Sequence, residues 1–295
     1  MTVLLTGANG FIGRTLAPLL INAGYNVICT GRKPTPAAGS SRQGSFYASL
    51  DFTDPFAVHD IFHEVKPEVV VHCGAMSKPE ECEIEQWQAY LVNVEGTMNI
   101  MQNAAEHHSH LLFLSTDFIF DGVKGMYREE DVPSPVNYYG QTKLEAEDII
   151  ASHTDPWTII RTVLVYGKTL PGRPDLLSTV KEKLSNGQVY NVVNDQYRTP
   201  TLVDDLAKGI LLTIQKKLEG VYHISGEEVM TPYEMAVRLA DHLHLDKQLL
   251  NPVESSFFPQ AARRPMRTGF DISRIKAGGY APVSFQRGLE HAFPG

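Results

Sequence analysis

The chain has 295 residues, of which 43% are hydrophobic and 20% charged, and its formal net charge is −8. This is the composition of an ordinary globular protein, and a negative chain without a basic stripe argues against a nucleic-acid partner. No apolar run approaches the ~20 residues of a membrane-spanning helix, and the first apolar strand begins too early to leave room for a signal peptide. We therefore expect a cytoplasmic protein without a membrane partner.

Cysteine and histidine residues give no sign of a disulfide or a metal site. Cys29 and Cys73 lie in apolar, strand-like runs, so we interpret them as small core residues. His107, His108 and His110 come at the end of a predicted helix without matched acidic or cysteine partners, which indicates a solvated helix end. We therefore expect no metal.

An apolar run, a glycine-rich turn and an amphipathic helix open the chain. Gly7, Gly10 and Gly13 recur every three residues between the run at 3–6 and the apolar repeat at 14–21. Glycines let the backbone approach a diphosphate closely, and the free N–H groups at a helix start attract its negative charge. An ordinary turn that needs glycine for positive φ is the alternative. The predicted cofactor-binding residues of this loop are Gly7, Asn9, Gly10, Phe11, Ile12 and Gly13.

Strand-like and helix-like segments alternate through the first half of the chain. Strands are predicted at 26–30, 44–50, 68–73, 111–116 and 157–161, and helices at 54–65, 86–107 and 138–151. Asp54 followed by Pro55 marks the start of the first of these helices, and 39–44 is predicted to be a loop. This βαβ rhythm predicts an α/β fold with a Rossmann-type doubly wound parallel sheet.

The rhythm breaks after Gly167, where residues 168–175 are rich in proline and glycine. Beyond it, helices are predicted at 176–185, 202–217 and 232–243, and strands at 190–193 and 220–225. We expect a smaller C-terminal α/β substrate domain that exchanges segments with the first domain. The predicted boundaries are 1–167 plus about 198–225 for the NADP(H)-binding Rossmann domain, and about 168–197 with 226–295 for the substrate-binding domain.

The end of the second predicted strand bears on the choice of cofactor. An NAD-binding fold usually has an acidic residue there for the ribose hydroxyls, but this chain reads Thr30-Gly31-Arg32-Lys33. Because a guanidinium donates two parallel hydrogen bonds, Arg32 with Lys33 suits a 2′-phosphate, so NADP(H) is preferred and NAD(H) stays open. Two merely exposed cations are the alternative. Asp51, after the third strand, is predicted to bind the adenine amino group or else to cap a turn.

Tyr139 and Lys143 lie four residues apart, on one face of a predicted helix. An unperturbed tyrosine has a pKa near ~10, and a neighbouring ammonium is expected to lower that pKa into the working range. Ser115-Thr116 ends a strand at the carboxyl edge of the sheet, where a hydroxyl can hydrogen-bond a carbonyl beside the tyrosine. We predict Thr116, Tyr139 and Lys143 to be catalytic. An exposed Tyr–Lys pair is the alternative, and Tyr138 is five residues from the lysine and off its face.

Together these motifs resemble the extended branch of the short-chain dehydrogenase/reductase superfamily, which acts on nucleotide sugars. The resemblance covers nearly the whole chain and implies a nicotinamide cofactor, which Tyr139 and Lys143 also contact. It matches Asn93, in the segment 93–97, to the branch's structural asparagine. By position after the fourth strand, Gly74, Ala75 and Met76 border the nicotinamide.

A narrower similarity is to dTDP-4-dehydrorhamnose reductases. It rests on four stretches, at 115–122, 133–140, 161–167 and 195–201. It implies hydride transfer to the C4 ketone of a nucleotide-linked 4-keto-6-deoxy sugar, as in the formation of dTDP-L-rhamnose. The predicted substrate-binding residues are Ser77, Asp117, Arg198, Arg263 and Arg264.

Two other functions fit the same motifs. Epimerases and dehydratases of the extended branch use the same three catalytic residues but consume no NADPH. A cofactor-binding regulatory subunit is the second alternative, and the intact Thr116, Tyr139 and Lys143 argue against it, since a pure binder needs no such set. The helices predicted at 86–107 and 138–151 are compatible with a homodimer.

Overall fold

The computed structural model describes residues 1–34, 45–153, 155–168 and 175–294. The loop predicted at 39–44 and most of the stretch at 168–175 lie outside the described residues. Cys29 is buried and Cys73 packs against the same apolar core, and both thiols are free. Among the described helices, none is long and apolar enough to cross a membrane.

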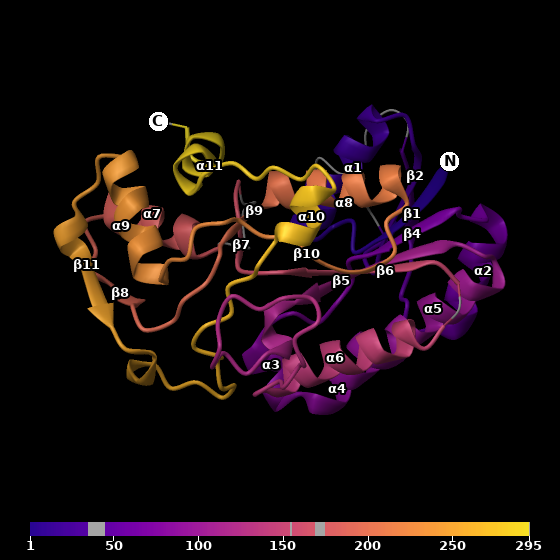
Figure 1. Ribbon diagram of the computed structural model, residues 1–295, viewed down its shortest axis with the longest axis horizontal. Helices are drawn as coiled ribbons and strands as arrows, with labels where there is room; N and C mark the ends of the chain where they lie inside the picture. The colour runs from indigo at the N-terminus through magenta and orange to yellow at the C-terminus, as the bar shows by residue number, and fades with distance from the viewer. Residues whose placement is uncertain (35–44, 154, 169–174, 295) are drawn as a thin grey trace.

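Seven parallel strands form the central sheet, in the order β10-β6-β5-β4-β1-β2-β3 (Figure 1). They are β1 (Thr2–Thr6), β2 (Asn26–Gly31), β3 (Ser45–Ser49), β4 (Val69–His72), β5 (His110–Thr116), β6 (Trp157–Thr162) and β10 (Gly220–His223). The order reverses between β1 and β4, which is the switch point where open α/β sheets bind ligands beyond the carboxyl ends of their strands. The predicted Rossmann-type fold is confirmed.

Helices cover both faces of the sheet, because alternate residues of each strand point to opposite sides. Val3 and Leu5 pack against one layer of helices and Leu4 packs against the other. The first layer contains α1 (Phe11–Asn22), α8 (Val203–Lys216) and α10 (Ser273–Ala277), and the second α2 (Pro55–Val65), α5 (Gly96–Glu106) and α6 (Tyr138–Ala151). As predicted, α2 begins at Pro55 with Asp54 as its N-cap.

The helix predicted at 86–107 is confirmed as a continuous helix over 86–106, but it contains a π turn that the sequence did not predict. The structure has α3 (Pro79–Ile84), α4 (Gln86–Tyr90), a π turn at Leu91–Glu95 and then α5. A π turn widens a helix by one residue, and here the Asn93 side chain within it bonds the chain that follows β4. Gly96 follows because a Cβ there would lie 2.6 Å from the Phe52 ring. Both contacts are long-range, so local periodicity does not encode them.

The second half of the chain builds a smaller lobe with its own apolar core, on the left of Figure 1. Its elements are α7 (Leu176–Ser185), β8 (Tyr190–Val193), α9 (Pro232–His242), β11 (Leu250–Val253) and α11 (Phe285–Ala292). β8 and β11 pair in parallel, and Thr231 and Glu234 form a capping box at the start of α9. Sequence patterns missed β11, which contains Pro252, and α11, which is only about two turns long. The domain boundaries stay a prediction.

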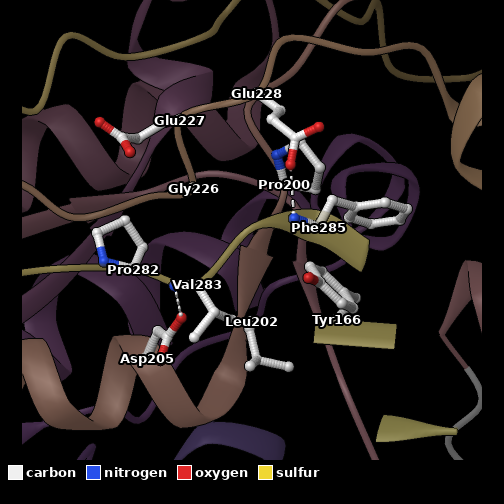
Figure 2. A pocket seen from close by; sticks show the side chains of 10 residues that line it. All are labelled: Tyr166, Pro200, Leu202, Asp205, Gly226, Glu227, Glu228, Pro282, Val283 and Phe285. Carbon is white, nitrogen blue, oxygen red and sulfur yellow. Dashed lines mark hydrogen bonds between the residues drawn. The ribbon is translucent and has the colours of Figure 1, made fainter. Parts of the chain in front are cut away.

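The two lobes meet at a closed junction beside the paired strands β7 (Val165–Tyr166) and β9 (Thr201–Leu202) (Figure 2). Asp205 of α8 accepts a hydrogen bond from the Val283 N–H at 2.8 Å, and Glu228 accepts one from the Phe285 N–H at 2.6 Å. Tyr166 packs against Phe285, with ring centroids 5.0 Å apart. The cavity between them is about 10 Å³, which is too small for a ligand larger than water.

A buried ion pair joins α6 to β6. Arg161 donates to Glu147 from Nη2 at 2.6 Å and from Nε to both carboxylate oxygens at 3.1 and 3.2 Å. Ser115 donates a further hydrogen bond to Glu147, and Arg161 donates one to the Glu129 carbonyl at 3.3 Å. Both charged side chains are more than nine-tenths buried. Because each has given up its hydration, removing one member leaves the other unpaired in an apolar interior.

We expect Arg161→Met to lower the free energy of unfolding by about 3–5 kcal/mol, because Glu147 is then buried without its partner. Replacing both residues with methionine should recover much of this loss. Urea unfolding followed by circular dichroism measures both effects. Arg287→Met, which removes an exposed pair with Glu290, is the control and should change stability by less than about 0.5 kcal/mol. Equal losses in the Arg161 and Arg287 variants would contradict this account.

Candidate active site

The glycine-rich loop between β1 and α1 lies tight against the end of β4. Gly7 has a φ of +66°, and a Cβ on it would lie 2.8 Å from the Cys73 carbonyl carbon. A Cβ on Gly13 would lie 2.5 Å from the Gly7 oxygen, which accepts a hydrogen bond from the Gly10 N–H at 2.8 Å. α1 follows Gly10 without a side-chain cap, so the amides of its first turn have no acceptor within the helix. These amides, of Phe11, Ile12 and Gly13, and the open backbone fit a dinucleotide diphosphate.

The end of β2 carries no acidic residue and is shaped by Tyr47 of β3. Arg32 and Lys33 are exposed there. The Asn9 amide donates to the Tyr47 hydroxyl at 2.8 Å, and that hydroxyl donates to the Lys33 carbonyl at 2.7 Å. Tyr47 therefore links the glycine loop to the two cations. Sequence reasoning missed it, because no motif marks a residue that acts only through its position on the neighbouring strand.

Asp51 lies just after β3 and is exposed. One of its carboxylate oxygens accepts hydrogen bonds from the Thr53 N–H at 3.1 Å and from the Thr53 hydroxyl at 2.7 Å. The turn-capping alternative is therefore observed, and the contact with adenine stays a prediction.

Asn93, in the π turn, clamps the segment after β4 that is predicted to border the nicotinamide. Its amide oxygen accepts from the Met76 N–H at 2.8 Å, and its amide nitrogen donates to the Met76 carbonyl at 3.0 Å. The same nitrogen donates to the Thr142 hydroxyl of α6 at 3.0 Å. These hydrogen bonds fix the backbone of Gly74 and Ala75, which connect β4 to Met76.

A buried histidine that the sequence did not single out extends this clamp into the sheet. His72 Nδ1 lies 2.6 Å from the Thr6 hydroxyl oxygen, and Nε2 lies 3.2 Å from that of Thr97. Thr97 donates its proton to the Asn93 carbonyl at 2.7 Å, so His72 Nε2 is the donor to Thr97 and Nδ1 the acceptor from Thr6. Thr6 in turn accepts from the Gly74 N–H at 3.4 Å. Burial lowers the pKa of His72 to about 3, which keeps the ring neutral.

The start of α6 brings two of the predicted catalytic residues together. The Asn137 side chain caps this helix by accepting from the Gly140 N–H at 2.8 Å. A Cβ at Gly140 would collide with the Phe118 carbonyl oxygen, so only glycine allows the helix to approach the end of β5 this closely. Tyr139 forms a hydrogen bond with Thr116, and its ring meets the Phe118 ring edge to face at 5.9 Å.

Lys143 lies one helical turn further along α6 and is buried. Its Nζ donates to the Leu114 carbonyl at 2.8 Å and lies 3.8 Å from the centroid of the Phe113 ring. Burial lowers the pKa of Lys143 to about 7, although the Glu147 carboxylate acts in the opposite direction.

The pKa of Tyr139 departs from the sequence prediction. Burial raises this pKa above its ordinary value. The prediction that Lys143 draws the pKa of the tyrosine downward is therefore wrong, because desolvation outweighs any help from the ammonium. A tyrosine in this environment holds its proton firmly at neutral pH.

Three predicted substrate residues lie on segments next to Tyr139. Ser77 is exposed and follows the clamped Met76. Arg264 donates to Glu80 of α3 at 2.6 Å, and its guanidinium carbon lies 6.0 Å from the centroid of the ring that packs on Tyr139. Arg263 is exposed, and its carbonyl accepts a hydrogen bond from the N-cap of α6 at 2.7 Å. Their contacts with a substrate stay predictions.

Arg198 has a different place from the one predicted. It is 4% exposed, and its guanidinium donates to the carbonyls of Tyr197 at 2.8 Å, Pro265 at 2.6 Å and Met266 at 3.1 Å. Its Nε faces a carboxylate oxygen of Asp117 at 3.6 Å. These contacts contradict the predicted contact with a substrate diphosphate, because the donors are already engaged inside the protein.

The histidines near the end of α5 also differ from expectation in part. His110 is not in a solvated helix end but opens β5, where its Nε2 lies 2.8 Å from the Thr158 hydroxyl oxygen. His108 is exposed and lies 3.2 Å from Asp155. Within the ranges that the structure describes, no three His, Cys, Asp or Glu side chains are grouped so as to hold a metal ion.

The family model described as the RmlD substrate binding domain matches residues 1–294. The chain belongs to this family. Curated relatives of this RmlD-family chain include the dTDP-4-dehydrorhamnose reductase of Aggregatibacter actinomycetemcomitans, which is 30% identical over 98% of this chain and 97% of its own. They also include methionine adenosyltransferase 2 subunit beta of Pongo abelii, 31% identical over 94% of this chain and 82% of its own.

Solved structures agree with the RmlD-family assignment. The dTDP-4-dehydrorhamnose reductase from Bacillus anthracis str. Ames in complex with NADP has a TM-score of 0.89 and 28% identity, with 99% of this chain and 98% of that chain covered. The Thermus thermophilus UDP-glucose 4-epimerase in complex with NAD has a TM-score of 0.88 over 99% of this chain and 97% of that chain. At 22% identity, this second likeness shows the fold alone.

We expect Lys143→Met to stabilise the protein at pH 6, without added cofactor, by on the order of 1–4 kcal/mol, because it removes a buried ammonium. The folded pKa of Lys143 is about 7, below the unfolded value near ~10.4. The unfolded chain therefore binds more protons between these two values, and wild-type stability rises with pH across that window.

The gain from Lys143→Met should thus shrink as the pH rises from about 7 towards 10. Thermal unfolding across this range measures it, with Lys181→Met on the exposed surface of α7 as the control. A variant that is less stable than the wild type at pH 6 would contradict the cost assigned to this lysine.

Proposed function

We propose that the protein is an oxidoreductase that transfers a hydride from NADP(H) to the C4 ketone of a nucleotide-linked 4-keto-6-deoxy sugar, as in the formation of dTDP-L-rhamnose. The observation that carries the proposal is the placement of α6 against the end of β5: Tyr139 hydrogen-bonds Thr116, and Lys143, one turn further along α6, donates to the Leu114 carbonyl. The dTDP-4-dehydrorhamnose reductases among the relatives support this reaction class, and the NADP complex supports the cofactor.

The proposed cofactor supplies the hydride, and the chain supplies its binding groups. The first-turn amides of α1 and the open backbone from Gly7 to Gly13 fit the diphosphate. Arg32 and Lys33 stand where a 2′-phosphate would lie, with no carboxylate at the end of β2 to repel it. The path from Gly74 to Met76, held by Asn93, borders the nicotinamide. NADP(H) is therefore favoured over NAD(H).

Tyr139 is the proposed proton donor to the ketone oxygen. Reduction needs a protonated phenol, and the raised pKa of Tyr139 keeps it in that form. Thr116 hydrogen-bonds the phenol and fixes its position. Once Tyr139 has given up its proton, the nearby Lys143 ammonium favours the phenolate that remains, and the same lysine is proposed to hold the nicotinamide ribose. Burial thus keeps Tyr139 protonated before the reaction, and the Lys143 ammonium favours the phenolate that the reaction leaves.

The substrate is proposed to lie between Tyr139 and the second lobe. Arg264 is partly exposed and pairs with the half-exposed Glu80, so a diphosphate can compete for its guanidinium. Arg263 and Ser77 are exposed on neighbouring segments. These segments, rather than the glycine loop, then determine which nucleotide base and which sugar the protein accepts.

We expect the protein to oxidise NADPH in the presence of a 4-keto-6-deoxy sugar nucleotide, with dTDP-linked compounds first in the test panel, and Tyr139→Phe to lower kcat by about 10²–10⁴-fold. The NADPH absorbance measures turnover, and fluorescence titration checks that the variant still binds NADPH. Tyr138→Phe, at the adjacent position, is the matched control and should keep its activity. Full turnover in Tyr139→Phe would remove that residue from the proposed role.

We expect Arg32→Ala to weaken NADPH binding by about 10-fold, because it removes a charge-assisted contact to the 2′-phosphate, and to leave NADH binding unchanged. Isothermal titration with both cofactors measures this difference. Arg287→Ala on α11 is the control. Equal losses for NADPH and NADH would mean that Arg32 does not recognise the 2′-phosphate.

A regulatory subunit is the second candidate, because methionine adenosyltransferase 2 subunit beta is 31% identical over 94% of this chain. In that case the protein would bind a methionine adenosyltransferase from its own organism and turn over no sugar nucleotide. Size-exclusion chromatography of the two proteins together with the NADPH assay separates the candidates. An epimerase would convert its sugar nucleotide without net NADPH consumption. The same chromatography tests the proposed homodimer.

A further inference from the structure

We propose that Asp117, Arg198 and Thr268 form a positioning assembly through which the second half of the chain fixes the direction of the Thr116 hydroxyl. The inference deepens the proposed function and rests on it, since Thr116 belongs to the proposed active site. It replaces a direct substrate contact of Arg198 and Asp117 with an indirect role. We call these three residues the Asp117 assembly.

Asp117 lies at the centre of the assembly and is buried, with 5% of its surface exposed. One carboxylate oxygen accepts a hydrogen bond from the Thr116 hydroxyl at 3.2 Å. The other accepts a hydrogen bond from the fully buried Thr268 hydroxyl and faces Arg198 Nε at 3.6 Å. Both oxygens are thus engaged within the protein, which leaves the carboxylate little means of binding a sugar hydroxyl.

The partners of Asp117 come from two separate segments of the second half. Arg198 is itself fixed by the carbonyls of Pro265 and Met266, and the Thr268 N–H donates to the Tyr197 carbonyl at 3.1 Å. The segments 196–198 and 265–268 are therefore bonded to each other as well as to Asp117. Arg264, a proposed ligand of the substrate diphosphate, lies immediately before the second segment.

The charge of Asp117 decides which way the Thr116 proton points. An ionised carboxylate only accepts hydrogen bonds, so the single proton of Thr116 is committed to Asp117. The Thr116 oxygen, which also accepts from the Phe118 N–H at 3.2 Å, then faces Tyr139 as an acceptor. In this arrangement the single phenol proton of Tyr139 points to Thr116 while no substrate is bound, and it turns to the ketone oxygen when the substrate binds.

Arg198 helps to keep Asp117 ionised and so maintains this arrangement of hydrogen bonds. Burial raises the pKa of Asp117 above its ordinary value, and the Arg198 guanidinium is the largest of the influences that oppose this rise. Without Arg198 the carboxyl group would more readily take up a proton and become a donor itself, which frees the Thr116 proton to point elsewhere. Arg198 and Thr268 are accordingly positioning residues: they touch neither the cofactor nor the reacting atoms.

Thr268→Val tests the assembly most cleanly, because it removes one hydrogen bond to Asp117 with little change in volume. We expect kcat with the sugar nucleotide to fall by roughly 10-fold and NADPH affinity to change by less than about 2-fold. Thr199→Val is the matched control: Thr199 is also fully buried and hydrogen-bonds Ser225 and the Phe270 N–H, but it has no contact with Asp117. Equal kcat values in the two variants would overturn the inference.

Arg198→Met and Arg198→Lys separate charge from packing. The methionine variant should lose more kcat than the lysine variant, because the lysine keeps a positive charge beside Asp117 even though it cannot bond all three carbonyls. If both variants lose the same kcat, Arg198 acts through packing alone and the inference fails. If either fails to fold, the Thr268 and Thr199 pair decides.

A readout without substrate keeps the test independent of the proposed reaction. Fluorotyrosine placed at position 139 reports on its surroundings through its ¹⁹F resonance, in the protein with NADPH bound. We expect Asp117→Asn and Thr268→Val to shift this resonance and Thr199→Val to leave it in place. An unchanged resonance in Thr268→Val would overturn the inference. If the wild type turns over no sugar nucleotide but the resonance shifts as expected, the proposed function fails and the assembly stands.

Discussion

The backbone at Gly7 lies so close to the end of β4 that no carbon atom fits between them. A Cβ there would lie 2.8 Å from the backbone of Cys73 and from that of Gly74. This approach brings the first turn of α1 to the switch point where the strand order reverses, and it fixes the distance between the glycine loop and the end of β4. Three features depend on this close approach of Gly7 to β4. They are the clamp by Asn93, the path from Gly74 to Met76 and the position of Tyr139.

Near that switch point the interior contains buried polar groups whose hydrogen bonds are directional. His72, Asn93 and Asp117 are almost fully buried, and each bonds chain segments that are distant in sequence. Buried polar groups of this kind are costly when left unpaired, so each one enforces a single arrangement of its neighbours. The apolar layers on the two faces of the sheet contribute stability through burial, whereas these groups determine which loop lies where. The arrangement of the loops around the site is therefore determined largely by these buried polar groups.

Local signals in the sequence predict much of the fold and part of the site. The glycine spacing and the Asp54-Pro55 helix start act within a few residues, and parallel strands bring Thr116 to the edge where Tyr139 lies. The π turn was not predictable, because it depends on contacts outside its own helix. Arg198 has a side chain of the type that binds phosphate, but its N–H groups donate to backbone carbonyls instead. Two of these carbonyls belong to residues 67 and 68 positions away in the sequence. The pKa of Tyr139 depends on how deeply the residue is buried, which spacing along a helix does not reveal.

The place of β10 in the sheet has a consequence for synthesis of the chain. β10 completes the edge of the sheet by pairing Gly220 with Thr158, and α7, β8, β9 and α8 are all made between these two partners. While a ribosome is still adding those elements, the open edge of β6 presents unpaired backbone N–H and C=O groups, and α1 lacks the helix that later packs beside it. The central sheet and the second lobe thus depend on each other through the order of translation. The Rossmann sheet is finished only after the start of the second lobe has been made.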